Sequence, residues 1–85
     1  MITKPTINLH GAMPGALLED HINAIHALRG AISYLAMAAP NGRDYQTAPP
    51  DAFAAAINEH RSRLARLESV MGELEQIAEY ISEQC

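Results

Sequence analysis

Apolar side chains recur with a helical period along the first half of this chain. The stripe consists of Leu18, His21, Ile25, Leu28, Ile32, Leu35 and Ala39. Alternating steps of three and four residues place these side chains on one face of an α-helix, and Ile22 and Ala36 widen that face. Pro14 suits a first turn, where its missing N–H has no intrahelical partner, and Pro40 ends the pattern. We therefore predict a helix over about residues 14–39.

A second stripe with the same period follows a proline-rich segment. It consists of Phe53, Ile57, His60, Leu64, Leu67, Met71, Leu74, Ala78 and Ile81. Val70 and Ile77 broaden its C-terminal half. Pro49 is pushed away from helical angles by Pro50, so we predict a second helix over about residues 50–83, with a loop over about 40–49.

Two helices joined by a loop of this length predict an all-α antiparallel hairpin. The second helix would extend past the first by about two turns. A hairpin centred on the loop would place His60 opposite Leu28 and Gly30. Two helices alone cannot enclose two wide apolar stripes, so we expect a homodimer or higher oligomer, most simply a four-helix bundle. A monomer capped by its own N-terminal arm is the alternative.

Residues 1–13 show no helical period and predict an extended arm. Its apolar residues Ile2, Ile7 and Leu9 need a surface to cover them. We expect the arm to pack along the overhang of the second helix or to reach onto a partner chain.

The composition narrows the function classes. The chain has 10 acidic and 6 basic residues, which disfavours nucleic-acid binding because that requires a clustered basic excess. No apolar run reaches the roughly 18 residues of a membrane span, and the N-terminus lacks the features of a signal peptide. Cys85 is the sole cysteine, so an intrachain disulfide is excluded. These features favour the cytoplasm.

Candidate catalytic and metal-binding residues do not form a pattern. His21 and His26 are five residues apart rather than the three or four that place two ligands on one helix face. No serine or cysteine has the context of an activated nucleophile. We therefore predict a protein without enzymatic activity, cofactor or metal. His21 and His60 fall in the apolar stripes, either as locally hydrogen-bonded residues that fix the helix register or as a pH-sensitive interface.

The loop carries the best candidates for partner binding. Between Pro40 and the Pro49–Pro50 pair stand Arg43, Asp44, Tyr45 and Gln46. Tyrosine and arginine are enriched at binding hot spots, and flanking prolines lower the entropy lost on binding. Alternatively, Tyr45 covers the open end of the hairpin. A secondary surface is predicted at the acidic end of the second helix, formed by Glu73, Glu75, Glu79 and Glu83.

The stretch that begins at Asn41, "NGRDYQTAPPDAF", and continues through "NEHRSRLARLES" and "GELEQIAEYI", resembles small helical proteins encoded by phages and prophages. In those proteins an "RDY" loop precedes a long helix. The resemblance implies a phage protein in the host cytoplasm that binds and modulates a host protein, for example as an anti-defence inhibitor.

Two further functions remain open. One is an oligomeric sponge that sequesters a cyclic nucleotide, with Arg29, Arg61 or Arg63 on the phosphates and Tyr34 or Tyr45 on a base. The other is a structural or assembly component of a virion.

Overall fold

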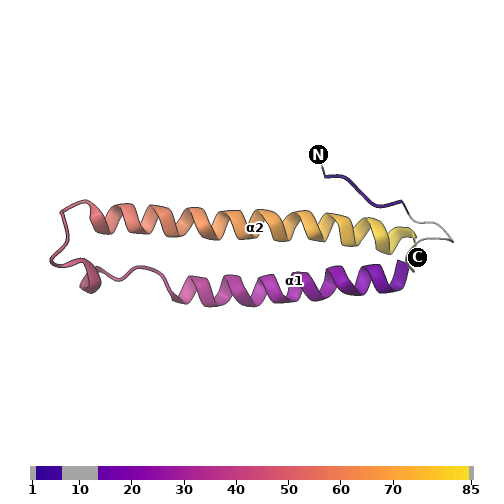
Figure 1. Ribbon diagram of the computed structural model, residues 1–85, viewed down its shortest axis with the longest axis horizontal. Helices are drawn as coiled ribbons and strands as arrows, with labels where there is room; N and C mark the ends of the chain where they lie inside the picture. Colours follow the sequence, from indigo (N-terminus) through magenta and orange to yellow (C-terminus); the bar gives the residue numbers. More distant parts are fainter. Residues whose placement is uncertain (1, 7–13, 85) are drawn as a thin grey trace.

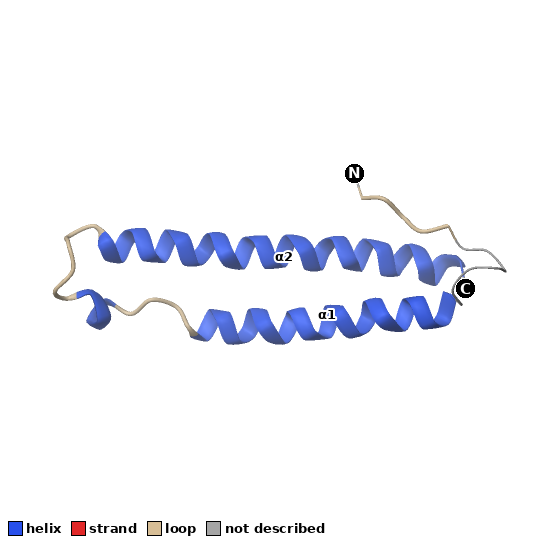
Figure 2. Ribbon diagram, viewed as in Figure 1, coloured by secondary structure: helices blue, strands red, loops and turns tan. Residues whose placement is uncertain are grey.

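Two long helices lie side by side and run in opposite directions (Figure 1). The computed structural model describes residues 2–6 and 14–84. Helix α1 spans Pro14–Met37 and helix α2 spans Ala52–Gln84, and a short 3-10 helix, η1, spans Gly42–Tyr45 between them (Figure 2). The described residues contain no strand. The predicted all-α antiparallel hairpin is confirmed, while its pairing with a second copy stays a prediction.

Helix α1 ends two residues before the predicted position. Its last turn tightens: the N–H of Ala38 donates to the carbonyl oxygens of both Tyr34 (3.2 Å) and Leu35 (3.0 Å), and the N–H of Ala39 donates to Ala36 O at 3.3 Å. Pro40 disfavours helical angles at the residue before it. The helix therefore unwinds ahead of the proline rather than at it.

Helix α2 begins at Ala52, two residues after the predicted position. Pro49, Pro50 and Asp51 instead form a turn, in which the N–H of Ala52 donates to Pro49 O at 3.0 Å. The carbonyl oxygen of Asp51 then accepts from the N–H of Ala55 at 3.0 Å, which is the first helical bond of α2. Asp51 thus occupies the N-terminal boundary, where an acidic residue favours the helix dipole.

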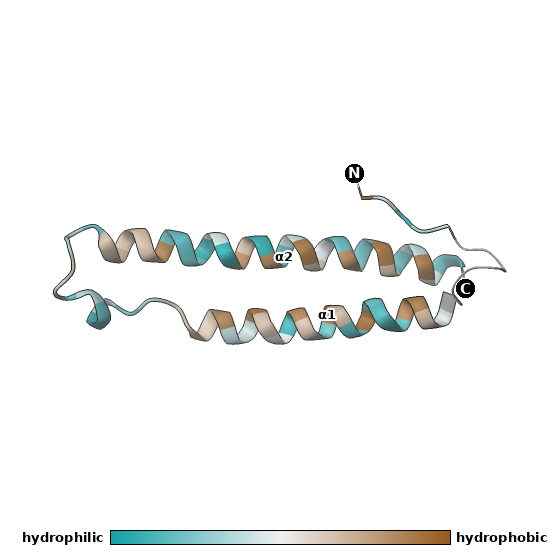
Figure 3. Ribbon diagram, viewed as in Figure 1, coloured by the Kyte–Doolittle hydropathy of each residue, from teal (hydrophilic) through white to brown (hydrophobic). Residues whose placement is uncertain are grey.

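The two apolar stripes face each other across the hairpin. Every residue of the predicted stripes except Ala39 is buried or half-buried, and the ribbon coloured by hydropathy shows apolar residues recurring along both helices (Figure 3). Ala39 lies beyond the end of α1 and is exposed. Full burial is nevertheless rare. Ile81 is 0% exposed, Ala78 9%, Ile25 8% and His60 6%, whereas the other stripe residues keep part of their surface in solvent.

The register of the two helices differs from the one expected for a symmetric loop. His60 lines a groove together with Ala36, Ala39 and Pro40 at the end of α1, not opposite Leu28 and Gly30. The cause is the connecting segment. Residues 38–51 lie beside the first turns of α2, which extend past the end of α1 (Figure 1), so α1 ends opposite a later part of α2.

The N-terminal arm lies at the other end of the hairpin. Residues 2–6 run beside the C-terminal part of α2 (Figure 1), where the Lys4 ammonium stands 5.8 Å from the centre of the Tyr80 ring. The expectation that the arm covers the overhang of α2 is therefore wrong for these residues, because the overhang is at the loop end and the loop itself occupies it. Ile7 and Leu9 lie outside the described residues.

Neither α1 nor α2 is both long enough and apolar enough to cross a membrane.

Candidate functional site

The loop at the tip of the hairpin has a backbone held by local hydrogen bonds. We call residues 41–46 the tip loop. The Asn41 side-chain oxygen accepts from the N–H of Arg43 at 3.0 Å, and the Asn41 carbonyl accepts from the N–H of Asp44 at 2.9 Å. Asn41 therefore caps η1 in the way that an asparagine caps a longer helix. The loop therefore adopts a defined turn.

An aromatic contact fastens the tip loop to α2. The rings of Tyr45 and Phe53 are 5.8 Å apart between centroids and tilted by 40°, within the range that favours aromatic pairs. A Cβ atom placed on Gly42 would lie 3.8 Å from the Phe53 ring, so the loop backbone also passes close to this ring. Tyr45 is half-buried. It covers the end of the hairpin and keeps part of its ring in solvent.

The segment that returns from the tip loop to α2 is restrained as well. The N–H of Ala48 donates to Tyr45 O at 3.2 Å, and Pro49 and Pro50 fix two successive φ angles. A loop restrained at both ends loses less conformational entropy when it binds a partner. The tip loop is therefore preorganised.

Three of the four predicted contact residues point their polar groups to solvent. Arg43, Asp44 and Gln46 are exposed. Within residues 2–6 and 14–84 neither Arg43 nor Asp44 forms an ion pair; the pair present there joins Arg63 and Glu59, with 3.9 Å between nitrogen and oxygen. The tip loop thus presents a cation, an anion and an amide whose hydrogen-bonding groups are open to a partner.

A mainly apolar groove lies near the same end of the hairpin, between α1 and α2. It has a volume of about 250 Å³ and is lined by Ala36, Ala39, Pro40, Ile57, His60, Arg61 and Leu64. The Nε2 atom of His60 is buried and has no hydrogen-bond partner among the described residues. His21 differs, because its Nδ1 lies 2.8 Å from the carbonyl oxygen of Leu17. Only His21 shows the local hydrogen bond that the sequence interpretation proposed for both.

The acidic end of α2 faces the N-terminal arm. Gln76, Glu79, Tyr80 and Glu83 line a shallow hollow of about 160 Å³ together with Lys4. Glu73 and Glu75 are also exposed. This predicted secondary surface is therefore partly occupied by residues of the same chain, and Lys4 supplies a positive charge beside it.

Residues proposed for a nucleotide site are spread over the hairpin. Arg61 lines the groove, Tyr45 packs on Phe53 at the tip, and Tyr34 is 76% exposed. Among the described residues, no three histidine, cysteine, aspartate or glutamate side chains form a group that could hold a metal ion. Cys85 lies outside the described part of the chain. The tip loop is therefore the best-formed candidate site.

Because comparisons with known proteins found no match, a function for this chain is inferred mainly from the geometry of the candidate site. No protein-family model, curated protein or solved structure matches this chain. The likeness to phage-encoded helical proteins stays a prediction from the sequence.

Sequence reasoning missed how the tip loop is attached. It placed Phe53 in the helix stripe and Tyr45 in the loop without connecting the two rings. The available signal was their position: the first large apolar residue of α2 follows the loop directly, so it lies at the open end of the hairpin where a loop ring can reach it. The cap formed by Asn41 was also signalled, since asparagine is a preferred capping residue.

Proposed function

We propose that this chain is a non-catalytic interaction protein that binds a partner protein through its tip loop. The observation that carries this proposal is a preorganised loop with exposed Arg43, Asp44 and Gln46, held against α2 by the contact between Tyr45 and Phe53. In this proposal Arg43, Asp44 and Gln46 make the polar contacts, and Tyr45 holds the loop against Phe53.

The position of the loop suits this role. The chain extends 62 Å along its longest axis, and the loop forms one end of the hairpin (Figure 1). A partner can reach the loop there without meeting the sides of the helices. Charged groups on a fixed backbone give specificity through complementary charges, and arginine is among the residues that most often dominate binding energy.

The likeness to phage and prophage proteins suggests a class of partner. On that basis we propose that the protein acts in the cytoplasm of a host cell. Its partner is then a host protein whose activity it modulates, with inhibition of a defence effector as the specific case.

The test compares two double variants that remove the same charges. Arg43→Ala with Asp44→Ala alters the tip loop, and Glu19→Ala with Arg29→Ala alters exposed positions of α1. The wild type is used to capture proteins from host lysate, the captured partner is purified, and its affinity is measured by titration calorimetry. We expect the loop variant to bind at least about fivefold more weakly, the loss that corresponds to about 1 kcal/mol. The α1 variant should bind like the wild type.

Two results would count against the proposal. Equal affinity of the loop variant and the wild type, with unchanged helical content by circular dichroism, would reject the tip loop as the contact surface. Heat released on titration with a cyclic dinucleotide would instead support the sponge function, which requires Arg29, Arg61 or Arg63.

A further inference from the structure

The whole chain, with its arm, leaves more surface in water than a compact chain of its mass. Its accessible surface is 6342 Å², whereas a compact monomer of 9.2 kDa exposes about 4,900 Å².

The two long edges of the hairpin can be told apart by the groove near its tip. Ala36 directly follows stripe residue Leu35, and Arg61 directly follows stripe residue His60. Both line the same groove, so residues at these equivalent positions of the two helices share one edge. Residues directly before stripe positions such as Ile25 therefore share the opposite edge, because they project from the other side of the stripe.

That opposite edge carries a row of apolar side chains. We call these residues the apolar edge: Leu17, Ala24, Ala31, Ala56, Val70 and Ile77. The charged residues that also directly precede stripe positions are Asp20, Glu59, Arg63, Arg66 and Glu73, and they flank this row. Val70 is 46% exposed, and Leu17, Ala24, Ala56 and Ile77 are only half-buried. The groove edge carries Arg29, Arg61, Glu68 and Glu75, all exposed, together with Ile22, which is 39% exposed.

The described part of the arm lines a hollow whose other residues lie outside the apolar edge. Residues 2–6 contribute Lys4 to a hollow lined by Gln76, Glu79, Tyr80 and Glu83, and none of these residues belongs to the apolar edge. Small side chains dominate that edge, and alanine allows the backbones of two helices to approach closely. Its shape and composition fit another helical surface.

The charges of α2 are separated along the helix in a way that selects one orientation of a partner helix. On the side of the apolar edge, Arg63 and Arg66 precede Val70 and Glu73 follows it, whereas Arg61, Glu68 and Glu75 belong to the groove edge. Two antiparallel copies of α2 that meet at Val70 bring the bases of one copy near Glu73 of the other, whereas two parallel copies oppose like charges.

We propose that the apolar edge binds a second copy of this chain, related by a two-fold axis near Val70, with the two α2 helices antiparallel. The interface is isologous, so each residue of the edge contacts the same set of residues in the other copy. The half-buried seam becomes the core of a four-helix assembly. The tip loops then lie at opposite ends, which leaves both free for the partner proposed above.

The first test changes the centre of the interface. Sedimentation equilibrium of the wild type should give twice the chain mass of 9.2 kDa. Val70→Glu buries two unpaired carboxylates at the axis and should raise the dimer dissociation constant by about 100-fold or more. Ala31→Glu should also weaken the dimer. Ala65→Glu, at an exposed position of α2 away from both edges, adds the same charge and should leave the dimer intact.

The second test reads the orientation without disturbing the interface. Cys85→Ser removes the native thiol, and Ser82→Cys provides a spin-label site at an exposed position of α2. Twelve residues separate this site from Val70, so an antiparallel pair should show a label distance of about 36 Å or more. A parallel pair would hold the labels within about 20 Å, since packed helix axes lie about 8–10 Å apart.

Several outcomes would overturn the proposal. A wild type that stays monomeric at 100 µM, or a Val70→Glu dimer as tight as the wild-type dimer, would show that another segment or a different protein covers the edge. A short label distance would reject the antiparallel pairing. If Val70→Glu loses its helical signal, the spin-label distance in the wild-type background still decides the orientation.

Discussion

His60 is a polar side chain at an otherwise apolar position. It is 6% exposed and its Nε2 atom lacks a hydrogen-bond partner among the described residues. Leaving a buried polar group without a partner costs about 1–3 kcal/mol. The groove residues Ala36, Ile57 and Leu64 offer no side-chain donor or acceptor, and Arg61, which also lines the groove, forms no hydrogen bond with His60 Nε2. At the scale of single residues, His60 therefore destabilises the fold.

This cost predicts the effect of one substitution. His60→Leu keeps a similar volume and removes the unpaired atom, so it should raise the free energy of unfolding by about 1 kcal/mol or more. Urea denaturation followed by circular dichroism measures the change. His26→Leu, at an exposed position of α1, is the matched control and should have little effect. Destabilisation by His60→Leu would mean that the imidazole has a partner in solution, such as a group from a second copy.

At the scale of the elements, the periodicity of the sequence determines more of the structure than any single residue does. Steps of three and four residues identified α1, α2 and the faces that they bury. The two helix ends beside the loop were each misplaced by two residues, because the tightened turn before Pro40 and the turn at Pro49 depend on local hydrogen bonds. Periodicity carries no information about such bonds.

The loop was predicted least well, and its structure affected the rest of the hairpin. The sequence predicted a binding loop over residues 40–49 and a hairpin centred on that loop. The observed loop contains η1 and is attached to α2 through Phe53. This attachment shifted the register and placed His60 beside Ala36. The sequence predicted the residues of the tip loop. That Tyr45 packs on Phe53 while its neighbours are exposed could be seen only in the structure.

A prediction at the same scale concerns the interior of α1. Gly30 is exposed, and a Cβ atom added there would meet nothing within 4 Å. Alanine in place of glycine reduces the conformational entropy of the unfolded chain and favours the helix, so Gly30→Ala should stabilise the hairpin by about 0.5–1 kcal/mol. The urea midpoint should rise without a change in slope. Unchanged or lower stability would indicate that a partner packs closely over Gly30.

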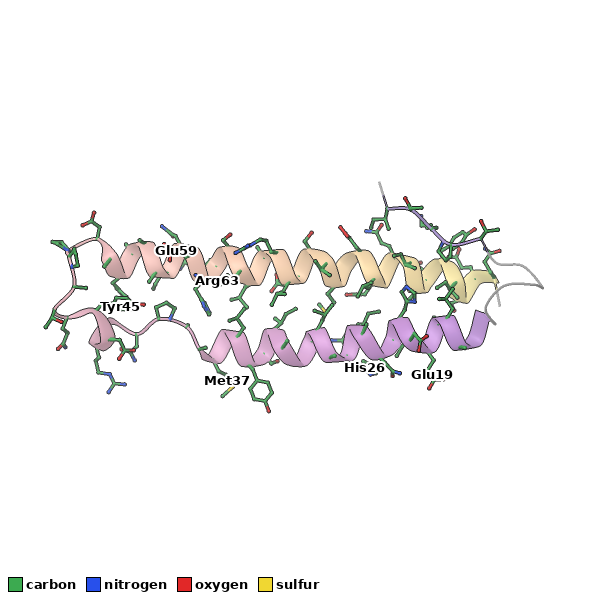
Figure 4. All side chains as sticks on the ribbon, in the orientation of Figure 1. Glu19, His26, Met37, Tyr45, Glu59 and Arg63 are labelled. Atoms are coloured by element: carbon green, nitrogen blue, oxygen red, sulfur yellow. The ribbon has the colours of Figure 1, made fainter. Side chains whose placement is uncertain are left out.

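At the scale of the whole molecule, the N-terminal arm brings a positive charge to the acidic end of α2. Acidic residues near a helix C-terminus oppose the helix dipole, and Glu79 and Glu83 stand in the last turns of α2. Lys4 of the arm lies in the same hollow and stacks over Tyr80 (Figure 4 draws these side chains). A positive group thus reaches the acidic end from within the chain. Met37, by contrast, points away from α2 and is 82% exposed.

The surface left open by the single hairpin leads to the last prediction. If a second copy covers the apolar edge, unfolding releases two chains, and mass action makes the folded dimer more stable at higher concentration. A tenfold increase in protein concentration changes the free energy by about 1.4 kcal/mol of dimer, so the thermal midpoint should rise by several degrees. Calorimetry at 10 and 100 µM measures this shift.

The same comparison for Ala65→Glu should show an equal rise, since its substituted side chain lies outside the interface. For Val70→Glu, the midpoint should be lower and independent of concentration, because its single hairpins unfold without dissociating. A wild-type midpoint that is the same at both concentrations would mean that one hairpin folds alone, with its alanine-rich edge exposed to water.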